Sequence, residues 1–177
     1  MELKNFIKLY ENVLDTDVCK KIVDKVDHSK FQSALISNEK ELSKYYRNCY
    51  EQLLNKEFEQ TIFESIGKIL SFYVKDFSFF SQTVEGIDTG YTHLLYKGGE
   101  KGEYKTHVDH MKTFPRVLSI SILLNNNFEG GDFCFFDEYV IEKKVGSAVV
   151  FPSSFMFPHG VLPVSNGDRH AIITWVR

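Results

Sequence analysis

The pattern of apolar and polar positions divides the chain into two parts. In the first part, apolar residues recur at helical spacing. The range 15–26 opens with Asp-Thr before an apolar stripe, which predicts a capped amphipathic helix. A longer stripe over 53–73 predicts a second helix, and the polar stretch 29–45 predicts a loop with a short helical turn. We therefore expect residues 1–75 to form a helical support layer.

In the second part, short β-rich runs are broken by Gly, Asn and Asp. In one run, four aliphatic residues alternate with Ser119 and Ser121, as in a strand with one apolar face. Asn166-Gly167 lies between two runs and predicts a tight hairpin turn. The predicted strands are Tyr91–Lys97, Glu103–Asp109, Arg116–Leu124, Asp132–Phe136, Ser147–Phe151, Gly160–Val164 and Arg169–Val176.

Helices followed by many short strands predict an α+β fold that is mainly β, with a helical layer backing a sandwich or barrel. We expect one domain over 1–177, with the β core in 76–177. Hydrophobic residues make up 43% and charged residues 25% of the chain, as in ordinary globular proteins. The 16 Phe and nine Tyr predict an interior rich in aromatic rings.

Charge and targeting signals narrow the class of partners. The net charge is -3 and no basic block is visible, which argues against nucleic acid. No apolar run is as long as a membrane span, and the first residues lack the apolar segment of a signal peptide. Three scattered cysteines fit free thiols in a reducing compartment. We expect a cytoplasmic monomer that does not bind membranes.

Candidate chemistry lies at His107 and Asp109, which would project together because strand residues two apart share a face. His159 would supply a third ligand from a nearby strand. Two imidazoles and one carboxylate form the ligand set of a facial iron(II) site with open positions. Taken alone, the His-x-Asp motif fits a surface His beside a solvated Asp better than a metal site, and the surrounding residues reverse this interpretation. Arg169, ten residues after His159, adds a cation suited to an anionic co-substrate.

Ordered segments surround this motif: Tyr96–Glu100, Tyr104–Asp109, Arg116–Ser119, Leu124-Asn125, Phe128–Phe133, Gly146–Phe151, Pro158–Gly160, Val161–Val164, Gly167–Arg169 and Trp175. Together they resemble the prolyl-4-hydroxylase-like 2-oxoglutarate oxygenases, from about residue 91 to 176. The resemblance implies a double-stranded β-helix (jelly-roll) core with His107, Asp109 and His159 as catalytic iron ligands. The first 75 residues carry no motif that matches this family.

The same resemblance implies a co-substrate site. Arg169 would bind the far carboxylate of 2-oxoglutarate through its planar fork, the alternative being a surface Arg paired with Asp168. Tyr96 would reach the co-substrate or be a core aromatic. Thr174 and Trp175 would line the pocket, although Thr174 could be an ordinary strand residue. Some relatives carry a Tyr that helps hold this carboxylate at the position of Leu123, so another donor must assist Arg169 or it acts alone.

The resemblance implies an Fe(II)- and 2-oxoglutarate-dependent dioxygenase that uses O₂, releases succinate and CO₂, and is compatible with ascorbate. The implied substrate is a prolyl residue of a protein or peptide, with a free amino acid or other small molecule as the alternative. Relatives that act on nucleic acid carry a second Arg six positions after the anchor, where this chain has Trp175. A non-catalytic jelly-roll binding module and a cupin-like metalloenzyme are the rival classes. Gly86–Gly90 and His110–Pro115 are candidates for a substrate cover.

Overall fold

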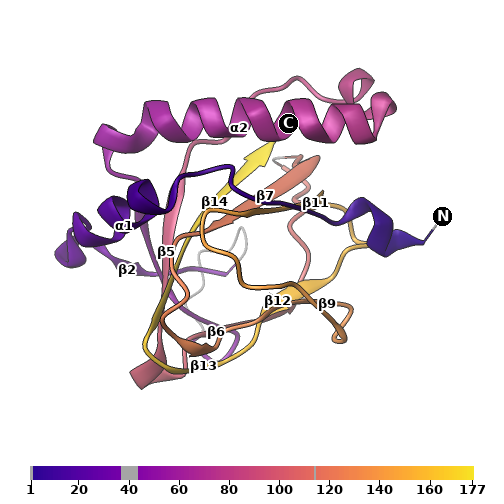
Figure 1. Ribbon diagram of the computed structural model, residues 1–177. Coiled ribbons are helices and arrows are strands. Elements are labelled where there is room, and N and C mark those ends of the chain that lie inside the picture. The colour runs from indigo at the N-terminus through magenta and orange to yellow at the C-terminus, as the bar shows by residue number, and fades with distance from the viewer. Residues whose placement is uncertain (1, 37–43, 114) are drawn as a thin grey trace.

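The computed structural model describes residues 2–36, 44–113 and 115–177, and two antiparallel sheets dominate them (Figure 1). The larger sheet has the strand order β1 (Lys8–Tyr10), β11 (Ala148–Pro152), β7 (Leu118–Leu123), β14 (Asp168–Val176), β5 (Thr92–Lys97), β4 (Tyr50–Leu53) and β2 (Gln32–Ser33). The smaller has the order β10 (Tyr139–Val140), β9 (Phe133–Phe135), β12 (His159–Val161), β6 (Glu103–His107) and β3 (Arg47–Asn48). A further ladder joins β13 (Val164–Asn166) and β8 (Glu129–Gly130).

Two α-helices cover the outer face of the larger sheet, and α2 lies across it in Figure 1. The Asp15 side chain caps α1 (Thr16–Asp24), and the Asn55 side chain caps α2 (Lys56–Asp76). Among the described residues, no helix is long and apolar enough to cross a membrane. Short 3-10 turns are η1 (Leu3–Phe6), η2 (His28–Lys30), η3 (Ser78–Gln82) and η4 (Gly98–Glu100).

Strand alternation assigns the two faces of the larger sheet to two separate cores. On β7, the aliphatic residues Leu118, Ile120 and Ile122 pack against the helices. Leu123 points to the opposite side, into an aromatic-rich core shared with the smaller sheet. The alternation predicted for this strand is therefore confirmed, as is the mainly β, α+β jelly-roll class.

The expected helical layer of 1–75 is only partly correct. Strands β1 to β4 also lie in this range and extend both sheets. They are two to four residues long, too short to give a periodic signal. The second helix begins at Lys56 instead of Leu53, because Leu53 pairs with Thr92 in the sheet. Part of the loop predicted over 29–45, residues 37–43, lies outside the described residues.

The prediction that Asn166-Gly167 joins two strands that pair with each other in a hairpin is wrong. A tight turn does form there, with Gly167 at a φ of 68° and its N–H donating to the Asn166 side chain. However, β13 pairs with β8, whereas β14 pairs with β5 and β7. The turn passes the chain from one sheet to another, and it places Arg169 near the start of β14.

Candidate functional site

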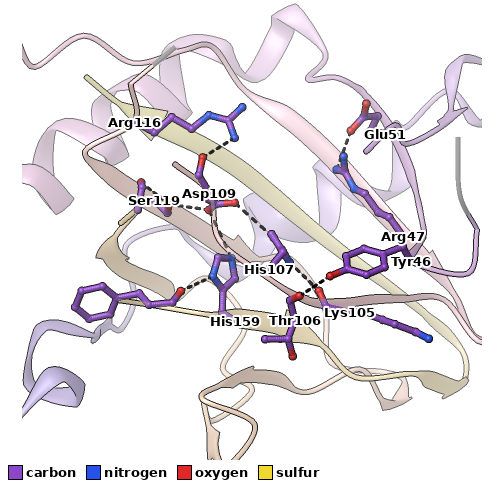
Figure 2. A network of polar contacts seen from close by, with 12 residues as sticks. Tyr46, Arg47, Glu51, Lys105, Thr106, His107, Asp109, Arg116, Ser119 and His159 are labelled. Carbon is purple, nitrogen blue, oxygen red and sulfur yellow. Dashed lines mark hydrogen bonds and ion pairs between the residues drawn. The ribbon is translucent and has the colours of Figure 1, made fainter. Parts of the chain in front are cut away.

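His107, Asp109 and His159 meet between the two sheets, as Figure 2 shows. His107 ends β6 and His159 begins β12, and the two residues are direct partners in the ladder. One potential ligand atom from each of the three residues lies within 4.8 Å of the others. Asp109 was predicted inside the strand, but the strand ends at His107 and Asp109 follows it. Its carboxylate still faces both rings, with each His Nε2 at 3.5 Å from one of its oxygens.

Backbone carbonyls fix the orientation of both imidazoles. His107 Nδ1 lies 2.9 Å from the Lys105 carbonyl oxygen, and His159 Nδ1 lies 3.0 Å from that of Phe157. A carbonyl can only accept, so each Nδ1 carries a proton and each Nε2 lies on the side of Asp109. This is the tautomer and orientation that a metal-binding imidazole needs.

The charge states also fit a metal ion. Burial raises the pKa of the Asp109 carboxyl, but the attraction of His159 and His107 outweighs it and holds that pKa well below the usual range. Burial lowers the pKa of His159 to about 4, against an opposing pull from Asp109. Near neutral pH the pocket thus holds one carboxylate and a neutral His159, the forms in which these groups bind a cation.

Two buried serines lie behind the carboxylate. Ser119 Oγ donates to Asp109 Oδ2 at 2.7 Å and lies 2.7 Å from Ser153 Oγ. Both serines have a relative exposure of 0%. The polar face predicted for β7 therefore faces the triad, a contact that the sequence pattern alone did not reveal.

Aromatic rings hold the two imidazoles in place. Tyr104 stacks on His107 with ring centroids 3.5 Å apart, and Phe133 stacks on His159 at 5.5 Å. The Arg47 guanidinium lies 4.8 Å from the centre of the Tyr104 ring and completes the stack. Arg47 comes from the N-terminal region, where the sequence carried no recognisable motif. Its position beside the site depends on β3 pairing with β6.

Arg169 is buried in the same inner pocket as the triad. Its Nε has no hydrogen-bond partner, and no carboxylate of the described residues lies within ion-pair distance of it. Its guanidinium lies 5.2 Å from the centre of the Tyr96 ring, its partner across β5 and β14. Burial lowers the pKa of Arg169. A buried cation without a carboxylate is costly, so this position calls for an anionic ligand.

The other predicted pocket residues divide by strand face. Tyr96 and Trp175 line the inner pocket, and the buried Trp175 Nε1 has no hydrogen-bond partner among the described residues. Thr174 is also buried, but it lies on the opposite face of β14, between Ile172 and Val176, which pack against the helices. The prediction that Thr174 lines the pocket is therefore wrong.

The site opens into a cleft of about 1180 Å³. Residues of the segment His110–Lys112 and Arg116 line it, as expected for His110–Pro115, of which Phe114 lies outside the described residues. The Gly86–Gly90 loop does not line the cleft; it runs along the end of β14, where Thr89 exchanges hydrogen bonds with Trp175. That loop is therefore no substrate cover in this conformation.

A jelly-roll with two imidazoles, one carboxylate and an inner arginine defines a metal-dependent oxygenase class. Residues 91–177 match the 2OG-Fe(II) oxygenase superfamily. Among the relatives, a PKHD-type hydroxylase of Psychrobacter sp. is 37% identical over 78 residues, 41% of this chain and 29% of its own length. One of Alteromonas mediterranea is 34% identical over 91 residues, 44% of this chain and 39% of its own.

Solved structures show the same fold over nearly the whole chain. A Pseudomonas putida prolyl-4-hydroxylase aligns over 97% of this chain and 92% of its own, with a TM-score of 0.73 and 19% identity. A Trichoplax adhaerens prolyl hydroxylase, solved with a hypoxia-inducible-factor peptide fragment, aligns over 97% and 83% with the same score and identity. Over residues 91–177 this chain therefore matches the 2OG-Fe(II) oxygenases, a superfamily that uses Fe(II), 2-oxoglutarate and O₂, and it shares its fold with solved prolyl hydroxylases. It spans 29% to 39% of the two PKHD-type relatives.

Proposed function

We propose that this protein is an Fe(II)- and 2-oxoglutarate-dependent dioxygenase that hydroxylates a prolyl residue of a protein or peptide, with release of succinate and CO₂. The observation that carries the proposal is a buried, unpaired Arg169 in the same pocket as His107, Asp109 and His159. A cation-binding triad beside an anion-binding arginine suits a dianion that also chelates metal.

Each residue has a role in the proposal. His107, Asp109 and His159 would hold iron, which supplies the oxidation of a substrate C–H bond by O₂ when bound. Arg169 would pair with the far carboxylate of 2-oxoglutarate, and Tyr96 and the Trp175 indole N–H would contact the co-substrate. Leu123 offers no hydroxyl, so we assign the second donor for the carboxylate to Ser121, which lines the same inner pocket.

The prolyl substrate is supported by the names of the relatives and by the volume of the cleft. The solved relatives are prolyl hydroxylases, one with a bound peptide fragment. The cleft volume of about 1180 Å³ exceeds that of most small-molecule pockets, which hold roughly 300–1,000 Å³. An open cleft of this size suits a peptide segment better than a free amino acid.

The test is succinate release from 2-oxoglutarate with Fe(II) and ascorbate, with and without proline-containing peptides. We expect slow release alone and faster release with a peptide that gains one oxygen atom by mass spectrometry. His107→Ala should abolish both iron binding and turnover, because it removes a ligand. A wild-type protein that neither binds iron nor turns over 2-oxoglutarate would support the non-catalytic binding module instead.

A further inference from the structure

The walls of the cleft carry more positive than negative charge. Its basic side chains are Lys30, Arg47, Lys112 and Arg116, and its acidic ones are Glu51 and Asp109. Arg47 is neutralised by Glu51 at 2.9 Å. Among the described residues, Lys30 pairs with the exposed Asp27 alone, at 3.5 Å, a pair of little strength. In a chain of net charge -3, the part of this face that the described residues form is therefore locally cationic.

Loading the site does not remove that excess. In the proposed function, the charges of Fe(II) and Arg169 offset those of Asp109 and the 2-oxoglutarate dianion. The loaded centre is then close to neutral in formal charge. Lys30, Lys112 and Arg116 remain in the cleft, and none of the described carboxylates forms an ion pair with Lys112 or Arg116.

Arg116 is held in position before any substrate arrives. Its guanidinium lies 3.5 Å from the centre of the Trp175 ring, and its Nη1 donates to the Asp109 backbone carbonyl at 3.3 Å. Figure 2 shows the side chain directed toward Asp109. An arginine fixed by stacking keeps further N–H groups for a second acceptor and loses little side-chain entropy on binding. Such a group favours a carboxylate close to the reacting centre.

The lining of the cleft also includes apolar side chains. Leu35, Tyr46, Val108 and Met111 are among its lining residues. The phosphate backbone of a nucleic acid makes no favourable contact with apolar side chains unless its bases are exposed. A peptide, in contrast, presents apolar and charged side chains together. The combination favours an acidic peptide segment.

We propose that the substrate is an acidic peptide segment, with carboxylate side chains flanking the oxidised residue. One carboxylate would lie near Arg116 and Lys112, and another near Lys30, which also lines the cleft. This inference rests on the proposed function, and it names the sequence context that the enzyme selects.

The test uses three short peptides with one central proline and flanking Glu, Gln or Lys. Binding is measured by fluorescence anisotropy on the protein loaded with Fe(II) and 2-oxoglutarate without O₂, and hydroxylation by mass spectrometry in air. We expect the Glu peptide to bind about tenfold more tightly than the Gln peptide, from several weak charge pairs. The Lys peptide should bind most weakly, and high salt should narrow all differences.

Variants locate the effect in the cleft. Lys30→Gln with Lys112→Gln should remove most of the preference for Glu over Gln while 2-oxoglutarate turnover without peptide continues. Lys68→Gln, on the exposed side of α2, is the matched control and should keep the preference. Equal binding of the Glu and Gln peptides, or equal competition by a single-stranded oligonucleotide, would overturn the inference. Loss of 2-oxoglutarate binding in wild type would instead overturn the proposed function.

A separate observation concerns the serines behind Asp109. Ser119 has one proton and donates it to Asp109 Oδ2, so the contact with Ser153 must be a donation from Ser153. In the resulting chain Ser153–Ser119–Asp109, both serines are fully buried and Asp109 faces the cleft. We infer that Ser119 is a positioning residue that fixes the rotation of the Asp109 carboxylate for iron binding, given that Asp109 is a ligand as proposed.

Iron affinity tests this role directly. Ser119→Ala should weaken Fe(II) binding about tenfold or more, as other residues behind metal ligands do, and Ser119→Thr should restore it. Ser65→Ala removes a buried hydroxyl bonded to the Thr61 carbonyl on α2 and should leave Fe(II) binding unchanged. Unchanged iron affinity in a folded Ser119→Ala protein would overturn the assignment, whereas wild-type protein without iron affinity would overturn the proposed function.

Discussion

The two faces of the larger sheet are built from the same strands but differ in what they bury. On β14, Ile172 and Val176 face the helices, whereas Arg169 and Trp175 face the pocket. The helix face gains stability from apolar burial. The pocket face holds buried N–H donors without partners. One strand therefore has two roles. Its helix face stabilises the fold, and its pocket face provides polar groups that can bind a ligand.

The helix face has polar exceptions of its own. His93 Nε2 and His170 Nδ1 lie 3.0 Å apart on that face, and both rings are buried. Unlike His107 and His159, they have no carboxylate between them among the described residues. A pair of histidines thus forms a candidate metal site only where an acid converges with it.

The largest stability effect should follow from a change on the helix face. Ile120 has a relative exposure of 0%, so Ile120→Ala leaves a cavity and should cost about 2–5 kcal/mol in the free energy of unfolding. Denaturant unfolding would measure this, and iron binding should persist while the protein is folded. Phe63→Ala, at an exposed position of α2, should change stability by less than about 0.5 kcal/mol. Similar losses in both variants would contradict the division between the faces.

Arg169→Met should separate stability from binding on the pocket face. Loss of a buried, charge-assisted contact should weaken 2-oxoglutarate binding by about 30-fold or more, while iron binding persists. The metal-free variant should unfold at a higher temperature than wild type, because a buried unpaired cation is removed. Calorimetric titration and thermal unfolding measure the two effects. Equal loss of iron and 2-oxoglutarate binding would refute the separate roles.

The His93–His170 pair should make stability fall in acid. Burial lowers the pKa of His93 to about 3 and of His170 to about 4, against about 6.5 in the unfolded chain, with His28 adding repulsion. Below about pH 6.5 the unfolded state binds more protons. This contribution to stability is therefore complete above pH 6.5 and is lost progressively as pH falls toward 4.

Denaturant unfolding from pH 7.5 to 4 measures this loss. His159 contributes in the same direction, so the measured quantity is the difference between wild type and a His93→Gln, His170→Gln double variant. The free energy of unfolding of that variant should depend less steeply on pH than that of wild type. If the free energy of unfolding falls with the same slope against pH in both proteins, the His93–His170 pair is not the cause of the loss.

The smallest effect should come from Thr174. Its hydroxyl is buried on the helix face without a partner, so Thr174→Val should change stability by less than about 1 kcal/mol and leave 2-oxoglutarate affinity unchanged. Trp175→Phe is the matched change on the pocket face and should weaken co-substrate or peptide binding, because it removes the indole N–H. A larger loss of 2-oxoglutarate affinity for Thr174→Val than for Trp175→Phe would reverse the assignment of faces.

Strong local periodicity explains what could be predicted from the sequence. The alternation in β7 and the Asp15 cap of α1 were predicted correctly because neighbouring residues determine them. The three residues of the triad were found by motif, and the strand pairing brings them together.

Long-range pairing explains what the sequence did not reveal. Arg47 reaches the site because a two-residue strand joins the smaller sheet, and Ser119 reaches Asp109 because β7 crosses behind it. Neither contact has a local signal. Thr174 was misplaced although alternation from Arg169 already assigned it to the other face, so this error was avoidable.

The position of β14 has a consequence for how the chain folds. This strand lies between β5 and β7, which are synthesised earlier and are not neighbours without it. During translation, a nascent chain that has not reached residue 168 exposes two unpaired strand edges. Such non-local closure predicts slow folding and a need for protection from aggregation until β14 inserts.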